Sequence, residues 1–158
     1  MKVIKVFLYV MLFFIAAVLE TIVVPHIEIF GARPSFFLIL TVTIALRHGS
    51  LAGCFAGFMA GLFCDVYASI EWLGAYSLSY CVVGFAAGQI EENFINLNLI
   101  PKIIVLSATE LIKDILYFFC ISKSSNDIWL SFVSISLPNS VYTITLGAIL
   151  FYIITPRK

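Results

Sequence analysis

The stretch GCFAGFMAGLFCD, residues 53–65, is apolar, carries glycine at every fourth position and ends on an aspartate where the next glycine would fall. In an α-helix, steps of four residues place Gly53, Gly57, Gly61 and Asp65 along one slowly drifting ridge. Membrane helices associate through small residues, because these let two backbones approach closely. The spacing therefore predicts a helix face that packs against protein, either within this chain or on a partner helix.

Asp65 lies near the outer end of this predicted helix, where a charged side chain costs less than at the bilayer centre. Two hypotheses fit that position. The carboxylate reaches the outer interface or caps the following helix, or it makes a buried polar contact that the close glycine packing permits. Both stay open at the level of the sequence.

The composition indicates an all-α integral membrane protein. Of the 158 residues, 62% are hydrophobic and 11% are charged, whereas about 25% are charged in soluble domains. The formal net charge is zero, so nothing points to nucleic acid as a partner. The length suits a single polytopic domain over residues 1–158. Four cysteines lie in apolar runs without a C-x-x-C pair and are interpreted as small core residues: Cys54, Cys64, Cys81 and Cys120.

Six stretches are apolar and close to the length of about 20 residues that crosses a bilayer. The six predicted transmembrane helices are residues 3–24, 31–46, 51–67, 72–90, 101–121 and 138–154. The first run is longer than the apolar core of a secretory signal, so we expect an uncleaved span. For the last, either one kinked helix crosses Pro138, or Trp129–Leu137 lies at the interface and Pro138 begins the span, which we favour. Five spans is the alternative count.

The basic residues predict that both termini lie in the cytoplasm. With the N-terminus inside, six Lys and Arg residues fall on the cytoplasmic side and two on the outer side. Cytoplasmic loops carry the excess of positive charge in membrane proteins, so this asymmetry favours an N-in, C-in arrangement. The cytoplasmic residues are Lys2, Lys5, Arg47, Lys102, Arg157 and Lys158, and the outer residues are Arg33 and Lys123.

The fifth predicted helix carries Glu110, Lys113 and Asp114 on one side near its middle. Three central charges cost about 8–10 kcal/mol on insertion scales, and the apolar residues of the helix offset roughly 5 kcal/mol of that. We therefore expect this side to face the bundle interior, a cavity or a partner. A structural polar core is the favoured interpretation, and a ligand or ion site and a partner contact are the alternatives.

Motifs that carry chemistry are missing from the sequence. There is no H-E-x-x-H, no G-x-S-x-G and no P-loop. The two histidines, His26 and His48, fall in loops on opposite predicted faces and cannot share a metal ion. We expect a protein that is not an enzyme, with no catalytic, metal-binding or cofactor-binding residue and no cofactor.

The order of landmarks in residues 31–90 resembles the MreD family, the small polytopic rod shape-determining proteins of bacteria. That family shows an R-P opening of the second span, an A-L-x-x-G turn after it, a G-F-x-x-G-L-x-x-D span, a lone glycine and a G-Y/F pair. The residues outside the glycine ridge that carry this resemblance are Arg33, Pro34, Arg47, Gly49, Gly74 and Gly84. The chain departs from the family at Ser35, where an acidic residue is common.

The resemblance implies a non-enzymatic scaffold of the cell-wall elongation machinery in the bacterial inner membrane, surrounded by lipid. The family binds MreC through its transmembrane helix and links cytoplasmic MreB filaments to RodA and its transpeptidase partner. The implied fold is similar to the six-helix substrate-binding subunits of energy-coupling-factor vitamin transporters. The alternative is therefore a small-molecule-binding transport subunit that uses Glu110, Lys113 and Asp114 as ligand contacts.

Overall fold

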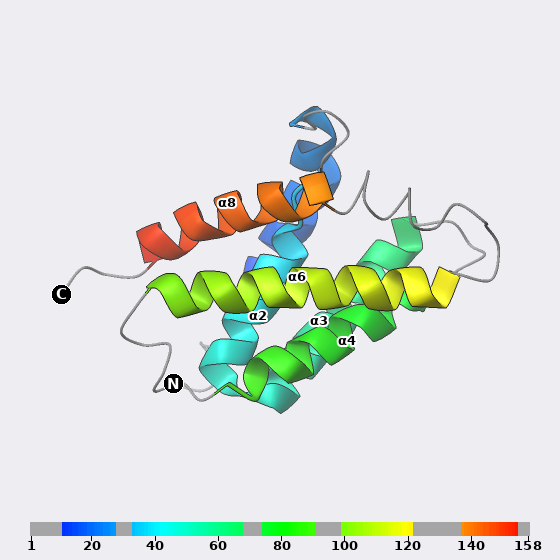
Figure 1. Ribbon diagram of the computed structural model, residues 1–158. Coiled ribbons are helices and arrows are strands. Elements are labelled where there is room, and N and C mark those ends of the chain that lie inside the picture. Colours follow the sequence, from blue (N-terminus) through cyan, green and yellow to red (C-terminus); the bar gives the residue numbers. More distant parts are fainter. Residues whose placement is uncertain (1–10, 28–32, 68–73, 91–98, 122–136, 155–158) are drawn as a thin grey trace.

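The computed structural model describes residues 11–27, 33–67, 74–90, 99–121 and 137–154 (Figure 1). The regular structure in these residues is helical, and no strand occurs among them, which confirms the predicted all-α class. The helices are α2 (Phe36–His48), α3 (Ser50–Tyr67), α4 (Ala75–Gly88), α6 (Leu99–Ile121) and α8 (Leu137–Ile154). The helical segment Met11–His26 precedes them, and its end contains the π-helical turn η1 (Leu19–Val23) and the 3₁₀ turn η2 (Val24–His26).

The start of α2 is set by its capping residues. Ser35 is extended, and its hydroxyl accepts a hydrogen bond from the Leu38 N–H at 3.3 Å. Such an N-cap satisfies a backbone donor that the helix itself leaves open. The helix therefore begins at Phe36, five residues after the predicted boundary at residue 31.

Two prolines lie in first turns, where the missing N–H costs no intrahelical hydrogen bond. Pro101 lies near the start of α6, and Pro138 follows Leu137 at the start of α8. Of the stretch predicted to lie at the interface, Trp129–Leu137, Leu137 alone is within the described residues. The predicted helix portions at residues 3–10, 31–32 and 72–73 also lie outside them.

The helices form one bundle with α3 and α4 as its most closely packed pair. α2 packs against both of these helices, α6 packs against α4, and α8 packs against α6. In Figure 1, α6 lies between α8 on one side and the α3–α4 pair on the other. Phe13 joins the first segment to the bundle, with ring centroids 5.4 Å from Phe37 on α2 and 5.2 Å from Phe63 on α3. Buried residues of α2 supply much of the core, namely Phe37, Leu38, Ile39, Val42, Ala45 and Leu46.

The outer faces of the bundle are apolar. Phe55 on α3 is 71% exposed and Phe119 on α6 is 82% exposed, and soluble monomers rarely expose such faces on several elements at once. Among the described residues, α3 is the one helix long and apolar enough to cross a membrane by length and composition. Six spans and the N-in, C-in orientation stay predictions.

Candidate helix-packing site and buried charge cluster

The glycine ridge of α3 faces α4 and is covered by it. Gly53, Gly57 and Gly61 are all buried. A Cβ added at Gly57 would lie 2.7 Å from the Tyr80 carbonyl carbon, and one at Gly61 would lie 2.6 Å from the Ser77 nitrogen. Real Cβ atoms do not approach backbone this closely, so glycine is required for the two helices to lie as near as they do.

Gly84 on α4 completes this contact. A Cβ at Gly53 would overlap the Gly84 carbonyl oxygen and Ala45, and a Cβ at Gly84 would lie 2.6 Å from the Gly53 carbonyl carbon. The two glycines therefore meet backbone to backbone at one level of the α3–α4 interface. This packing lies within the chain, and the ridge presents no open surface to a partner helix.

Asp65 ends the ridge and caps α4. The side chain is 1% exposed. Its two oxygens accept hydrogen bonds from the N–H of Tyr76 at 3.1 Å and of Ser77 at 3.0 Å, and the Ser77 hydroxyl also donates to it. A carboxylate at a helix N-terminus is stabilised by the open N–H groups and by the helix dipole. In the structure Asp65 caps α4, as the first hypothesis stated, and it does so through buried polar contacts, as the second hypothesis stated.

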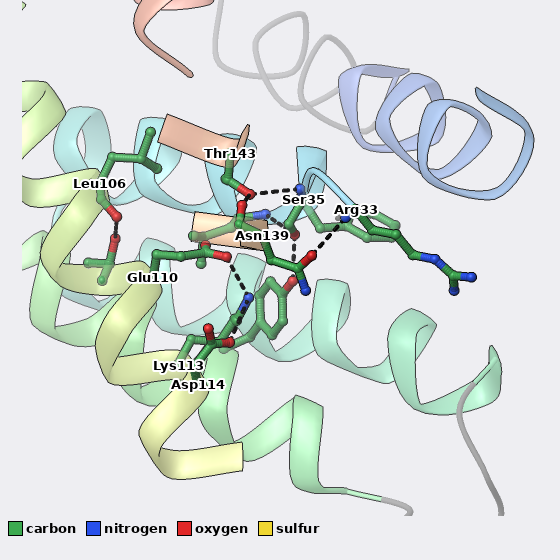
Figure 2. Close-up of polar contacts among 12 residues, drawn as sticks. Arg33, Ser35, Leu106, Glu110, Lys113, Asp114, Asn139 and Thr143 are labelled. Carbon is green, nitrogen blue, oxygen red and sulfur yellow. Dashed lines mark hydrogen bonds and ion pairs between the residues drawn. The ribbon is translucent and has the colours of Figure 1, made fainter. Parts of the chain in front are cut away.

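Glu110, Lys113 and Asp114 are all buried and form one cluster (Figure 2). Lys113 Nζ lies 2.8 Å from Glu110 Oε1 and 3.2 Å from Asp114 Oδ1. Its ammonium also lies 6.0 Å from the centre of the Tyr80 ring on α4. Because a lone buried charge is expensive, the two ion pairs are what make this lysine tolerable inside the bundle.

Each carboxylate of the cluster keeps one oxygen without a partner. Glu110 Oε2 and Asp114 Oδ2 are buried and accept no hydrogen bond. A buried acceptor that has lost water and gained no donor is costly, so both atoms mark a place where a proton, ion or ligand would be stabilised.

A second polar group surrounds the residues before α2. The backbone N–H of Arg33 donates to Asn139 Oδ1 at 2.7 Å, and that of Ser35 donates to Thr143 Oγ1 at 3.2 Å (Figure 2). The Ser35 and Tyr80 hydroxyls are hydrogen-bonded at 2.7 Å. These bonds connect α8 and α4 to the start of α2. Asn139 and Thr143 share one face of α8 at i and i+4, and this spacing is the sequence signal that could have indicated their role.

Glu20 has a similar role that the sequence analysis missed. Its Oε2 accepts hydrogen bonds from the N–H groups of Phe36 at 2.8 Å and Phe37 at 3.4 Å. The first helical segment therefore contributes a carboxylate to the N-terminus of α2, as Asp65 of α3 does for α4. A single acidic residue in an apolar run signals some buried or interfacial contact, but the spacing does not identify the helix that it caps.

Comparison with protein-family models gives a match to the rod shape-determining protein MreD over residues 1–156, essentially the whole chain. The chain belongs to the MreD family. This confirms the resemblance, and it makes the chain a rod shape-determining membrane protein of the bacterial inner membrane, from a family that is part of the MreBCD system. Comparisons with curated proteins and with solved structures gave no match.

Two of the residues that carry the MreD resemblance are glycines with positive φ. Gly49 has φ +85° and ψ −178°, and it separates α2 from α3 by a single residue. Gly74 has φ +99° and precedes the first residue of α4. Residues other than glycine rarely adopt these backbone angles, so the backbone conformation explains why glycine occurs at both positions.

The remaining residues of the MreD pattern lie at helix ends. Arg33 is exposed, Pro34 is buried and precedes the Ser35 cap, and Arg47 is exposed in the last turn of α2.

The thiols of Cys54 and Cys81 face each other across the α3–α4 contact, with 2.7 Å between their Sγ atoms. Across the described residues, no group of three or more His, Cys, Asp or Glu side chains could hold a metal ion.

Proposed function

We propose that this chain is a multi-pass, non-enzymatic scaffold of the bacterial cell-wall elongation machinery. In this role it binds the transmembrane helix of MreC and helps to link cytoplasmic MreB filaments to RodA and its transpeptidase partner. The match to the MreD family over residues 1–156 carries the proposal. The same match favours the scaffold over the transport-subunit alternative.

The α3–α4 hairpin is the platform on which we propose that MreC docks. Backbone contact along the glycine ridge leaves little freedom for one helix to shift against the other. The ridge itself is occupied by α4, and the small residues of the first segment, Ala16 and Ala17, are buried in the core. The outward face of α3 is free of such packing, and its exposed apolar residues are Leu51, Phe55, Phe58, Met59, Leu62 and Val66.

Cysteine crosslinking with co-purified MreC tests this docking face. Single cysteines would be placed on α3 (Phe55→Cys, Leu62→Cys) in a chain whose four native cysteines are serine, opposite single cysteines in the MreC transmembrane helix. We expect crosslinks from both α3 positions. The control is Ile115→Cys, which is equally lipid-facing on α6, with 57% exposure, and should give no crosslink.

A competing position is the first helical segment, where Val18 is 51% exposed. Crosslinks from Val18→Cys together with none from α3 would move the partner to the first span and reject α3 as the docking face. Failure of MreC to co-purify with the wild-type chain at all would reject the scaffold role itself.

A further inference from the structure

The buried cluster on α6 has more negative than positive charge. Fully ionised, Glu110 and Asp114 contribute two negative charges and Lys113 contributes one positive charge. The titratable groups that interact with the cluster from the elements packed around it are Glu20 on the first segment, Cys64 on α3, and Tyr76 and Tyr80 on α4. Asp65 lies beside Cys64, and the Tyr117 ring is stacked on Tyr76. Glu20 is a further carboxylate and none of these groups is a cation, so among them no second cation balances the carboxylates of the cluster.

The hydrogen bonds of the cluster show the same imbalance. Lys113 donates to one oxygen of Glu110 and lies in ion-pair contact with one oxygen of Asp114, at 2.8 and 3.2 Å. The second oxygen of each carboxylate, Glu110 Oε2 and Asp114 Oδ2, has no donor. Glu20 and Asp65 differ from this pair, because backbone N–H groups at helix N-termini donate to them. The cluster therefore has an excess of negative charge, and the same carboxylates also lack hydrogen-bond donors.

We propose that this cluster is a proton-binding site, in which Glu110 carries one proton on Oε2. The proton removes the excess negative charge and turns an unpartnered acceptor into a donor. Oε1 then serves as a carbonyl oxygen that still accepts from Lys113, and Lys113 keeps its ion pair with Asp114. Glu110 is the site because it is 0% exposed, whereas Asp114 is 8% exposed, and the more buried carboxylate gains more from neutrality.

A metal cation fits the cluster less well than a proton. The Lys113 ammonium already occupies the position between the carboxylates and would repel a second cation there. The hydroxyl of Thr143 on α8, which donates to the Asn139 carbonyl oxygen, is a neighbour of the Glu110 carboxylate. The proton site does not depend on the scaffold role, since it rests on contacts inside the bundle.

Infrared spectroscopy of the full chain in lipid nanodiscs at neutral pH tests the site. A protonated carboxylic acid has a C=O stretching band, shifted in D₂O, that an ionised carboxylate lacks. Glu20→Gln serves as the background chain, because the Glu20 carboxyl group lies near the cluster and would contribute to the same band. We expect the band in this chain, its loss when Glu110→Gln is added, and its retention when Asp114→Asn is added. Asp65→Asn, added to the same background chain, is the matched control and should retain the band.

Several outcomes would overturn the proposal. They are a Glu20→Gln spectrum without the band, a band that survives when Glu110→Gln is added, and a band lost only when Asp114→Asn is added. A missing band together with an unfolding temperature that rises with Na⁺ would assign the site to a metal cation instead. If the Glu110→Gln chain does not fold, ¹³C-labelled glutamate in the Glu20→Gln chain tests the proposal, because a protonated side-chain carboxyl carbon has a distinct chemical shift. The absence of that signal would overturn the proposal.

Discussion

Asp65 and the α6 cluster bury carboxylates by different means. The α3 aspartate receives three hydrogen bonds from the first turn of α4, which replace its lost hydration. The α6 carboxylates depend on one lysine, and each keeps an oxygen without a donor. We therefore expect removal of Asp65 to weaken one helix start, and removal of Lys113 to leave two buried carboxyl groups without their common partner.

Asp65→Ala should lower the free energy of unfolding by about 1–2 kcal/mol, the range for loss of a helix cap. Asp65→Asn should cost less, because an amide oxygen still accepts one of the N–H groups. Thermal unfolding in detergent measures both. Val66→Ala is the control, since Val66 is the next residue and is 74% exposed. Equal stability of Asp65→Ala and the wild type would contradict the cap.

Lys113→Leu should sharply reduce the yield of folded protein in membranes. Removing one partner of a buried ion pair costs about 3–5 kcal/mol, because the remaining charge stays buried. The yield of folded protein is measured as the amount of detergent-extracted monomer in fluorescence-detected gel filtration. The triple variant Glu110→Gln, Lys113→Leu, Asp114→Asn carries no charge and should recover part of the yield. Normal yield of the single variant would count against a buried cluster.

Between elements, the α3–α4 pair is held by backbone contact rather than by interlocked large side chains. Gly53, Gly57 and Gly61 face α4, and Gly84 faces α3, so each added methyl group would meet backbone atoms. Backbone cannot shift as a flexible side chain can. Substitutions on this ridge should therefore separate the helices, whereas substitutions on the outward face of α3 should not.

Gly57→Leu should weaken the recovery of MreC with this chain and round the cells that depend on it, because it distorts the proposed platform. Phe55→Leu is the control, as it changes an exposed apolar residue on the same helix. Pull-down from solubilised membranes and cell-shape microscopy give the two measurements. Rod-shaped cells with normal complex recovery in Gly57→Leu would reject this role for the ridge.

Gly49→Ala should destabilise the α2–α3 connection by about 1–3 kcal/mol, the cost of holding a non-glycine residue in a disallowed backbone conformation. Nothing lies within 4 Å of an added Cβ, so the effect would come from φ +85° alone. Thermal unfolding tests this, with Ser50→Ala as the control at the neighbouring position. A loss no larger than that of the control would show that the turn adopts other angles.

For the whole molecule, polar contacts at one end join segments that are distant in the sequence. Glu20 reaches the N-terminus of α2, while Asn139 and Thr143 on α8 accept from the backbone of Arg33 and Ser35. Hydrogen bonds therefore connect the first segment and α8 to the residues at the start of α2. These bonds hold α8 to α2 at a place where the two helices share few other contacts.

The predicted N-in, C-in arrangement with six spans is testable at this scale. An alkaline phosphatase reporter, active only in the periplasm, should be inactive when fused after Lys158 and active when fused within residues 122–127. The physical reason is the excess of Lys and Arg on the predicted cytoplasmic side. A cytoplasmic reporter at the same positions should give the opposite pattern. An active phosphatase at the C-terminus would favour five spans.

Local spacing and composition were enough to predict the all-α membrane class and a packing face on α3, and the resemblance of residues 31–90 to MreD landmarks indicated the family. The class and the packing face depend on helical periodicity and on runs of apolar residues, which are local properties of the sequence. The charges at Glu110, Lys113 and Asp114 likewise predicted a polar site, because lipid penalises them wherever the helix lies.

Partners across the bundle required the tertiary structure. Which helix covers Gly57, which helix start Asp65 and Glu20 cap, and which carboxylate oxygens lack a donor depend on how helices distant in sequence pack together. A helical face constrains what can lie against it but does not identify its neighbour, since many small-residue surfaces and many N-termini would satisfy it equally. Close packing selected one neighbour for each face, and that choice produced both the rigid hairpin and the unpartnered oxygens on α6.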